Sequence, residues 1–341
     1  MWKPGDPAMS VIDPDWVKYS KDKPLLELTE SAILAASNAR VSGVQKQDSL
    51  SSAVSPFHDP KILQEDHDIP TRDGTTRIRV YRLKTSVDSQ HRGPLIVIYH
   101  AGGFCLGNYT MADADASRFC RRFSATCVSV DYRLAPEHQF PAAAHDAWDS
   151  FKWVVANYDG PLLTADPAQG FLLSGMSAGG TLAGVVSHLA RDQNISPRLT
   201  GVHMTVPGLI QRGAIPEKWK DELLSFEQNR NAPILNLVGV DLLARSYNAD
   251  MYSPLHNVLL NPNGHADLPP HFIQVAGLDP VRDTGIIYER ELREGHRIPT
   301  RITVYVGQPH AFWTFLPEMP ASVKYNEDVV NGVEWLLSRP Q

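Results

Sequence analysis

Cysteine is scarce in this chain of 341 residues, which has only Cys105, Cys120 and Cys127. An odd number of cysteines without metal-ligand spacing argues against a disulfide framework and is typical of a reducing compartment. A signal peptide is also lacking, because the first sixteen residues contain one lysine, three aspartates and three prolines instead of an apolar region. No run approaches the ~18 apolar residues of a membrane-spanning helix. We therefore expect a cytoplasmic protein without a transmembrane segment.

Clusters of positive charge are equally absent. Lysine and arginine are scattered and the formal net charge is −6, so the chain has no electrostatic footprint for a phosphate backbone, and nucleic acid is not expected as a partner. The hydrophobic share of 43% and charged share of 21% are ordinary for a globular protein that buries a large core. A small-molecule partner fits better, and the oligomeric state, monomer or homodimer, stays open.

Hydrophobic patterning predicts an α/β protein. A turn at residues 71–74 precedes an alternating segment at 77–83, which indicates a β-hairpin. Runs that are apolar on both faces suit a parallel sheet covered by helices on both sides. Amphipathic helical patterns lie between them, so we expect a three-layer αβα sandwich with a final helix near residues 329–337. The apolar runs are residues 95–99, 127–130, 171–173, 202–206, 272–276 and 302–306.

Two segments depart from this alternation and predict a cap. Residues 1–60 are polar and proline-rich, then helical around 25–39, and we assign them to an N-terminal cap segment. Residues 61–341 form the main domain, in which 211–250 have many leucines but no clear strand and read as an inserted cap segment. Insertions above the carboxyl edge of a sheet often build binding surfaces.

The sequence GMSAG at residues 175–179 matches the G-x-S-x-G pattern between an apolar run and a helical pattern. A serine on such a tight turn exposes its Oγ, and flanking glycines let strand and helix approach closely. By composition alone this pattern arises by chance in about one chain in ten of this length. Ser177 is therefore a candidate nucleophile that needs further support.

The HAGGF sequence at residues 100–104 follows the run at 95–99 and lies upstream of Ser177, where an oxyanion loop belongs. The backbone amides of Gly102 and Gly103, together with that of Ala178, would form a three-donor oxyanion hole. A plain glycine turn after a strand is the alternative reading.

Candidates for a base and an acid follow later strands. Among 13 histidines, His310 is singled out by its position just after the last apolar run, and Asp279 follows the run at 272–276. The order Ser, Asp, His is the one that α/β-hydrolases use. Asp283, four residues on, is the rival acid, and a capping or turn role for these residues is the structural alternative.

The chain resembles the hormone-sensitive-lipase-like carboxylesterases of the α/β-hydrolase fold over roughly residues 65–338. The resemblance depends on ordered motifs: HAGG at 100–103, DYRLAPE at 131–137, FPAA at 140–143, SAGG at 177–180, SPL at 253–255, DPVRD at 279–283 and HAF at 310–312. It implies that Asp279, not Asp283, is the catalytic acid. It also implies that 131–137 is a scaffold that braces the active-site loops.

Two positions depart from the family pattern. Ala101 stands where the family usually has glycine, so its methyl group could narrow the pocket, although the oxyanion amides come from the next two positions. Met176 stands where an aspartate commonly precedes the nucleophile, which removes a charge. Glycine-to-alanine drift without functional meaning is the alternative for Ala101.

The resulting hypothesis is a serine hydrolase that cleaves a carboxylic ester through an acyl-enzyme, with catalytic Ser177, Asp279 and His310. This chemistry needs no metal or organic cofactor. An acyltransferase, a lactonising enzyme or a product-releasing hydrolase of a biosynthetic pathway would use the same residues. A non-catalytic ligand receptor of the same fold is a further alternative. Aromatic residues of the cap segments, among them Trp2, Trp16, Tyr19, Trp219 and Phe226, could line a pocket, but ordinary packing is favoured.

Overall fold

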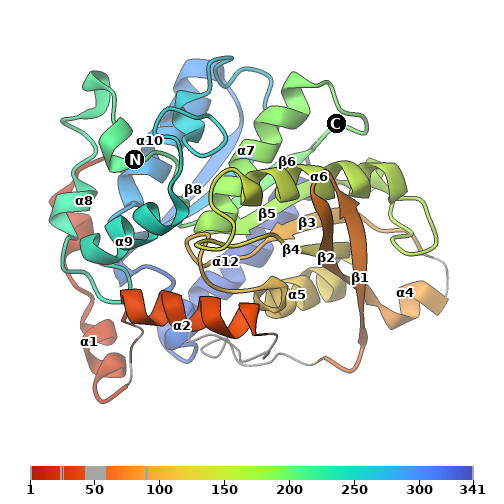
Figure 1. The fold of residues 1–341 in the computed structure, drawn as a ribbon, viewed down its shortest axis with the longest axis horizontal. Helices are drawn as coiled ribbons and strands as arrows, with labels where there is room; N and C mark the ends of the chain where they lie inside the picture. Colours follow the sequence, from red (N-terminus) through yellow and green to blue (C-terminus); the bar gives the residue numbers. More distant parts are fainter. Residues whose placement is uncertain (1, 24, 26, 43–58, 89–90, 340–341) are drawn as a thin grey trace.

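A single sheet forms the centre of the computed structural model, which describes residues 2–23, 25, 27–42, 59–88 and 91–339. Its strands are ordered β1-β2-β4-β3-β5-β6-β7-β8 (Figure 1). The pairs β1/β2 and β2/β4 are antiparallel, and all other pairs are parallel. The predicted hairpin and all six apolar runs are confirmed as strands. The bounds are β1 (Ile62–Thr71), β2 (Gly74–Leu83), β3 (Leu95–Tyr99), β4 (Thr126–Asp131), β5 (Phe171–Met176), β6 (Gly201–Thr205), β7 (His271–Leu278) and β8 (Thr300–Pro309).

Helices cover both faces of the sheet, because its central strands are apolar on both sides. In β3, Leu95, Val97 and Tyr99 belong to one buried cluster, and Ile96 and Ile98 belong to the other. The first cluster includes α6 (Ala142–Asn157), α7 (Ala178–Asp192) and α10 (Arg282–Arg290). The second includes α5 (Asp113–Phe123) and α12 (Pro320–Leu337). The expected three-layer αβα arrangement is therefore confirmed.

Short helices from the two predicted cap segments lie next to each other. A Cβ atom added to Gly239 in α9 (Leu237–Tyr247) would lie 3.3 Å from Leu28 Cδ1, just before α2 (Glu30–Val41). Figure 1 shows α2 and α9 on the same side of the molecule. The division into cap and core stays a prediction, and residues 43–58 lie outside the described residues.

The other helices are η1 (Pro7–Ser10), α1 (Pro14–Ser20), α4 (Lys84–Asp88), η2 (Tyr109–Ala112), η3 (Pro167–Gln169), η4 (Arg212–Ala214), η5 (Glu217–Trp219), α8 (Ser225–Gln228), η6 (Val258–Leu260), the π-helical turn η7 (Glu291–Gly295) and α11 (Phe312–Phe315).

The cysteines and the helix lengths bear on two of the sequence-based expectations. All three cysteines are buried and free, and the sulfur atoms of Cys120 and Cys127 lie 3.9 Å apart, well beyond the ~2.05 Å of a disulfide. In the part of the chain that the structure describes, every helix is too short or too polar to cross a membrane.

Candidate active site

Ser177 occupies a strained turn between β5 and α7. Its backbone angles are φ 55° and ψ −117°, a region that few side-chain-bearing residues adopt. The two flanking glycines make the turn possible: a Cβ atom would lie 2.1 Å from Gly179 O at Gly175 and 2.0 Å from Tyr99 O at Gly179. Any larger residue at either position would push strand and helix apart. The turn places the Ser177 hydroxyl at the carboxyl end of β5, at the start of a helix.

The structure brings the three predicted triad residues together. His310 Nε2 lies 3.0 Å from Ser177 Oγ, and His310 Nδ1 lies 2.7 Å from Asp279 Oδ2. The other carboxylate oxygen, Asp279 Oδ1, accepts a hydrogen bond from the Val281 amide at 3.0 Å. A carboxylate beside Nδ1 favours the tautomer that is protonated there, which leaves Nε2 as an acceptor for the serine hydroxyl. This arrangement can remove a proton from Ser177.

Asp283, the rival acid, has a different environment. Its Oδ2 accepts hydrogen bonds from the amides of Leu224 and Ser225, at 3.1 and 2.8 Å, and its Oδ1 accepts one from Arg282 Nε at 2.8 Å. Asp283 and Arg282 are both fully buried side chains. Asp283, which lies in α10, therefore binds the backbone amides at the start of α8, whereas Asp279 binds the imidazole of His310.

The predicted oxyanion loop is a tight turn after β3. Gly102 has φ 125°, and its carbonyl accepts hydrogen bonds from the amides of Cys105 and Leu106 at 3.0 and 2.9 Å. A Cβ atom on Gly102 would lie 1.9 Å from Leu106 O, so this turn requires glycine. Gly103 and Ala178 line the same cavity as Ser177. Ala178 is the first residue of α7, where an amide has no intrahelical acceptor.

The segment at residues 131–137 contacts this loop, as the family resemblance implies. The Tyr132 hydroxyl donates a hydrogen bond to His100 O at 2.7 Å. Glu137 pairs with Arg40 of α2 through two hydrogen bonds of 2.9 and 2.8 Å, and Arg40 also donates to Cys105 O at 3.1 Å. Sequence reasoning missed Arg40, because a lone arginine at the end of a helical pattern carries no signal of a distant partner.

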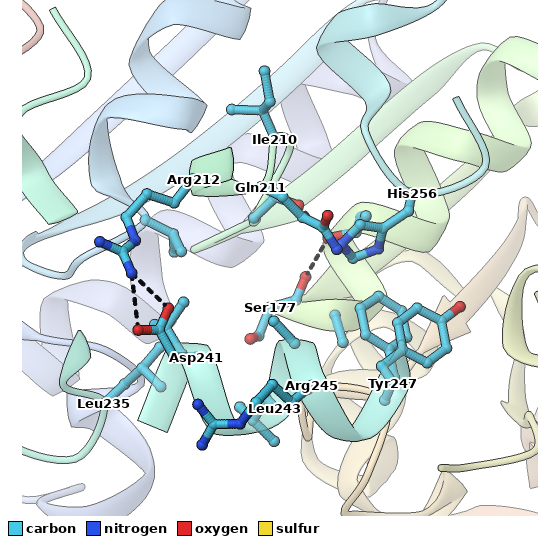
Figure 2. Close-up of a pocket in the computed structure, with 18 of the residues that line it drawn as sticks. Ser177, Ile210, Gln211, Arg212, Leu235, Asp241, Leu243, Arg245, Tyr247 and His256 are labelled. Atoms are coloured by element: carbon cyan, nitrogen blue, oxygen red, sulfur yellow. Dashed lines mark hydrogen bonds and ion pairs between the residues drawn. The ribbon is translucent and has the colours of Figure 1, made fainter. Parts of the chain in front are cut away.

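A largely apolar cavity of about 550 Å³ opens above Ser177 (Figure 2). Of the cap aromatics, Phe226 lines this cavity, whereas Trp16 and Trp219 are buried in the cores, so the packing interpretation holds for those two. Ala101 and Met176 are not among the cavity-lining residues within the described chain. The expectation that the Ala101 methyl group narrows the pocket therefore gains no support. Apolar contributors are Phe104, Ile210, Phe226, Leu235, Val240, Leu243, Ala244, Tyr247, Met251 and Val281.

Several polar side chains also line the cavity, and sequence reasoning identified none of them. Arg212 pairs with Asp241 at 2.9 Å, and Gln211, Arg245 and His256 lie along the same walls (Figure 2). Burial lowers the pKa of His256 to about 4, so its imidazole is neutral near pH 7. Within the described residues, no group of three or more histidine, cysteine, aspartate or glutamate side chains is arranged to hold a metal ion.

Comparison with known proteins places this site in a family. A family model described as alpha/beta hydrolase fold matches residues 96–314. An AB hydrolase superfamily protein of Schizosaccharomyces pombe is 43% identical over 270 residues, which cover 79% of this chain and 78% of that protein. Esterase LipI of Mycobacterium tuberculosis is 35% identical over 263 residues, covering 74% and 77%. The crystal structure of vibralactone cyclase matches with a TM-score of 0.87 and 31% identity, covering 100% of this chain and 99% of that one. The chain therefore belongs to the hormone-sensitive-lipase-like family of alpha/beta hydrolases and is an enzyme of the esterase type.

Proposed function

We propose that this enzyme hydrolyses carboxylic esters of small molecules through an acyl-enzyme intermediate on Ser177. His310 Nε2 accepts the hydroxyl proton while Ser177 Oγ forms a bond to the ester carbonyl carbon. The same proton then passes from His310 to the leaving alkoxide, and the alcohol departs. A water molecule, deprotonated by His310, next attacks the acyl carbon and releases the acid, which regenerates Ser177. Asp279 orients the imidazole and stabilises its charged form throughout.

The negative charge on the carbonyl oxygen is stabilised by amides from two separate elements. We assign the Gly102 and Gly103 amides of the oxyanion loop and the Ala178 amide at the start of α7 to this role. Each well-placed donor of this kind typically contributes about 3–4 kcal/mol to the transition state. The α7 terminus adds a favourable positive potential at the same point.

One observation carries this proposal: a chain of hydrogen bonds links Asp279, His310 and Ser177, and Ser177 lines a cavity that is mostly apolar. The cavity fits the acyl or alcohol part of an ester. The esterase LipI, a relative with 35% identity, supports the same reaction class.

A panel of p-nitrophenyl esters of increasing acyl length, assayed with the wild type and with Ser177→Ala, tests the proposal. We expect the wild type to hydrolyse at least the short esters and Ser177→Ala to lose at least 10³-fold in kcat while keeping the thermal unfolding midpoint. A Ser177→Ala variant that keeps a substantial fraction of the wild-type rate would rule out this mechanism.

A second function, acyl transfer or lactonisation, is favoured by the similarity to vibralactone cyclase over the whole chain. In that reaction a hydroxyl group of the substrate replaces water and attacks the acyl carbon. Product analysis by mass spectrometry with an added alcohol acceptor, or with a hydroxy-ester, separates the two outcomes. Formation of the free acid alone supports the hydrolase. A new ester or a lactone as the main product supports the transferase.

Labelling by a fluorophosphonate probe distinguishes both enzymes from a non-catalytic receptor of this fold. The probe forms a stable bond only with an activated serine, so we expect labelling of the wild type and none of Ser177→Ala. A wild-type protein that binds a small ligand but is not labelled would support the receptor.

A further inference from the structure

His256 is a polar side chain in a cavity wall that packing alone would fill with an apolar residue. Its ring lies against two aromatic rings, with centroid distances of 5.3 Å to Phe104 and 5.5 Å to Tyr247. Phe104 and Tyr247 stack on each other at 4.1 Å and line the cavity with Ser177 and His310. An aromatic hydrocarbon in place of the imidazole would suit these contacts equally well. The imidazole nitrogens therefore call for an explanation other than packing.

The imidazole of His256 lacks a hydrogen-bond partner for its buried nitrogen, Nδ1. Native proteins pair the large majority of buried polar atoms, so an unpaired one in the wall of a cavity requires an explanation. Since His256 lines the cavity, Nε2 is the nitrogen left for a bound molecule.

Gln211 is a second polar residue of the same cavity. It lines the cavity and is partly exposed. Asn257, fully buried, joins the two segments: its Oδ1 accepts a hydrogen bond from the backbone amide of Gln211 at 2.7 Å, and its Nδ2 donates to Met251 O at 2.6 Å. Asn257 thus fixes the backbone of Gln211 to the segment that carries His256, and Figure 2 shows Gln211 and His256 among the residues that line the cavity with Ser177.

We propose that His256, with Gln211, is a specificity-determining subsite that binds a neutral oxygen-bearing group of the substrate, a hydroxyl or a carbonyl separate from the ester. Nε2 of a neutral imidazole donates or accepts one hydrogen bond according to the tautomer, and a carboxamide offers both kinds of group. Neither carries a charge, so the pair matches an uncharged oxygen and not a carboxylate or an ammonium group. The natural substrate is then an oxygenated ester and not a plain alkyl ester. The inference rests on the ester chemistry proposed above.

Two matched pairs of p-nitrophenyl esters isolate this interaction. The 3-hydroxybutanoate and the 3-methylbutanoate differ by a hydroxyl in place of a methyl group, and the 4-oxopentanoate and the 4-methylpentanoate differ by a carbonyl oxygen. The quantity measured is the ratio of kcat/KM for the oxygenated ester to that for its alkyl partner. Comparing this ratio between enzyme variants cancels the intrinsic reactivity of each ester.

Three variants define the test. His256→Phe keeps the ring packing and removes both nitrogens, so we expect the ratio to fall about tenfold for at least one pair, the loss typical of one buried hydrogen bond. His256→Gln places an amide near the position of Nε2 and should recover the ratio to within about threefold of the wild type. His138→Phe, an exposed histidine outside the cavity, should leave the ratio unchanged.

The unfolding midpoint separates a binding role from a packing role. Because His256→Phe removes an unsatisfied buried polar atom, we expect its midpoint to stay level or rise. An unchanged ratio in both pairs, or an equal loss for both members of each pair with a lowered midpoint, would overturn the subsite. If the wild type hydrolyses none of the four esters and resists fluorophosphonate, the proposed ester chemistry fails instead.

Discussion

Two aspartates four residues apart, Asp279 and Asp283, have different roles because their neighbours differ. Asp279 lies against the His310 imidazole at 2.7 Å, and Asp283 accepts hydrogen bonds from two amides and from Arg282. Spacing along the sequence leaves both open as the acid, whereas the family motif favours Asp279. At the residue scale, substitutions can separate the two roles cleanly.

Asp279→Asn is expected to lower kcat by about 10³–10⁴-fold with little change in the free energy of unfolding, because an amide stabilises the wrong imidazole tautomer while filling the same space. Steady-state kinetics and urea unfolding of the same preparation measure both quantities.

Asp283→Asn provides the matched comparison. It leaves the buried Arg282 guanidinium without its charge partner, so the free energy of unfolding should fall by about 3–5 kcal/mol. The folded fraction of this variant should keep kcat within about tenfold of the wild type. A larger kcat loss in Asp283→Asn than in Asp279→Asn would assign the acid role to Asp283.

The oxyanion loop allows a second comparison between neighbouring residues. Gly102→Ala would place a methyl group 1.9 Å from Leu106 O, so the turn must shift and kcat should fall by about 10²–10³-fold, the effect of losing one donor. Ala101→Gly should change kcat/KM less than threefold, because the Ala101 methyl group does not line the cavity. A p-nitrophenyl ester assay tests both, and equal losses in the two variants would contradict this assignment.

At the scale of elements, α2 is tied to the oxyanion loop by one side chain. Arg40 donates two hydrogen bonds to Glu137 and one each to the carbonyls of Cys105 and Ala135. A planar guanidinium can make these four bonds together, and a lysine ammonium cannot match that geometry. The helix of the N-terminal segment is therefore coupled to the position of the proposed oxyanion donors.

Arg40→Lys is expected to lower kcat/KM by about tenfold, because small displacements of catalytic groups are costly in rate. Arg77→Lys is the matched control, since Arg77 and its partner Asp68 are exposed and such surface pairs contribute little. The kcat/KM of both variants for a p-nitrophenyl ester, measured at equal folded concentration, tests this prediction. If the kcat/KM of Arg40→Lys equals that of Arg77→Lys, α2 does not support the oxyanion loop.

At the scale of the whole molecule, a cluster of three buried histidines contributes, together with His256, to a dependence of stability on pH. His188 Nε2 lies 2.9 Å from His265 Nδ1, and His265 and His271 both pack against Tyr288. Burial lowers the pKa of His188 and His271 to about 4 and that of His265 to about 3. At pH values below 6.5, the ordinary pKa of histidine, these side chains bind protons in the unfolded chain but stay neutral in the folded protein. Stability from these groups is thus complete above about pH 6.5 and falls as pH decreases toward 4.

Urea unfolding at pH 7.5 and pH 5.5 should show this loss, at up to about 1.4 kcal/mol per pH unit for each histidine. His265→Asn removes one of the three groups and should reduce the difference between the two pH values. The same difference in His265→Asn as in the wild type would contradict this origin.

The sequence predicts the sheet well, and it singles out the three residues that the structure brings together, because both depend on local patterns. Each apolar run is a strand, and Ser177, Asp279 and His310 each follow a strand end, so parallel strands bring them to one edge. His256 and Gln211 were not predicted, since they belong to no periodic pattern and their segments are joined by a hydrogen bond from the Gln211 backbone amide to Asn257. Arg40 binds Glu137, which lies 97 residues further along the sequence. Such contacts between loops and helices depend on tertiary packing alone.

The central claim is a covalent acyl group on Ser177. Acid quenching during the first turnovers of a p-nitrophenyl ester, followed by mass spectrometry of the digested protein, tests it most directly. We predict that one acyl group is found on the peptide containing Ser177, and that it is absent from His310 variants. Hydrolysis that proceeds without this adduct, or with the acyl group on another residue, would contradict the account.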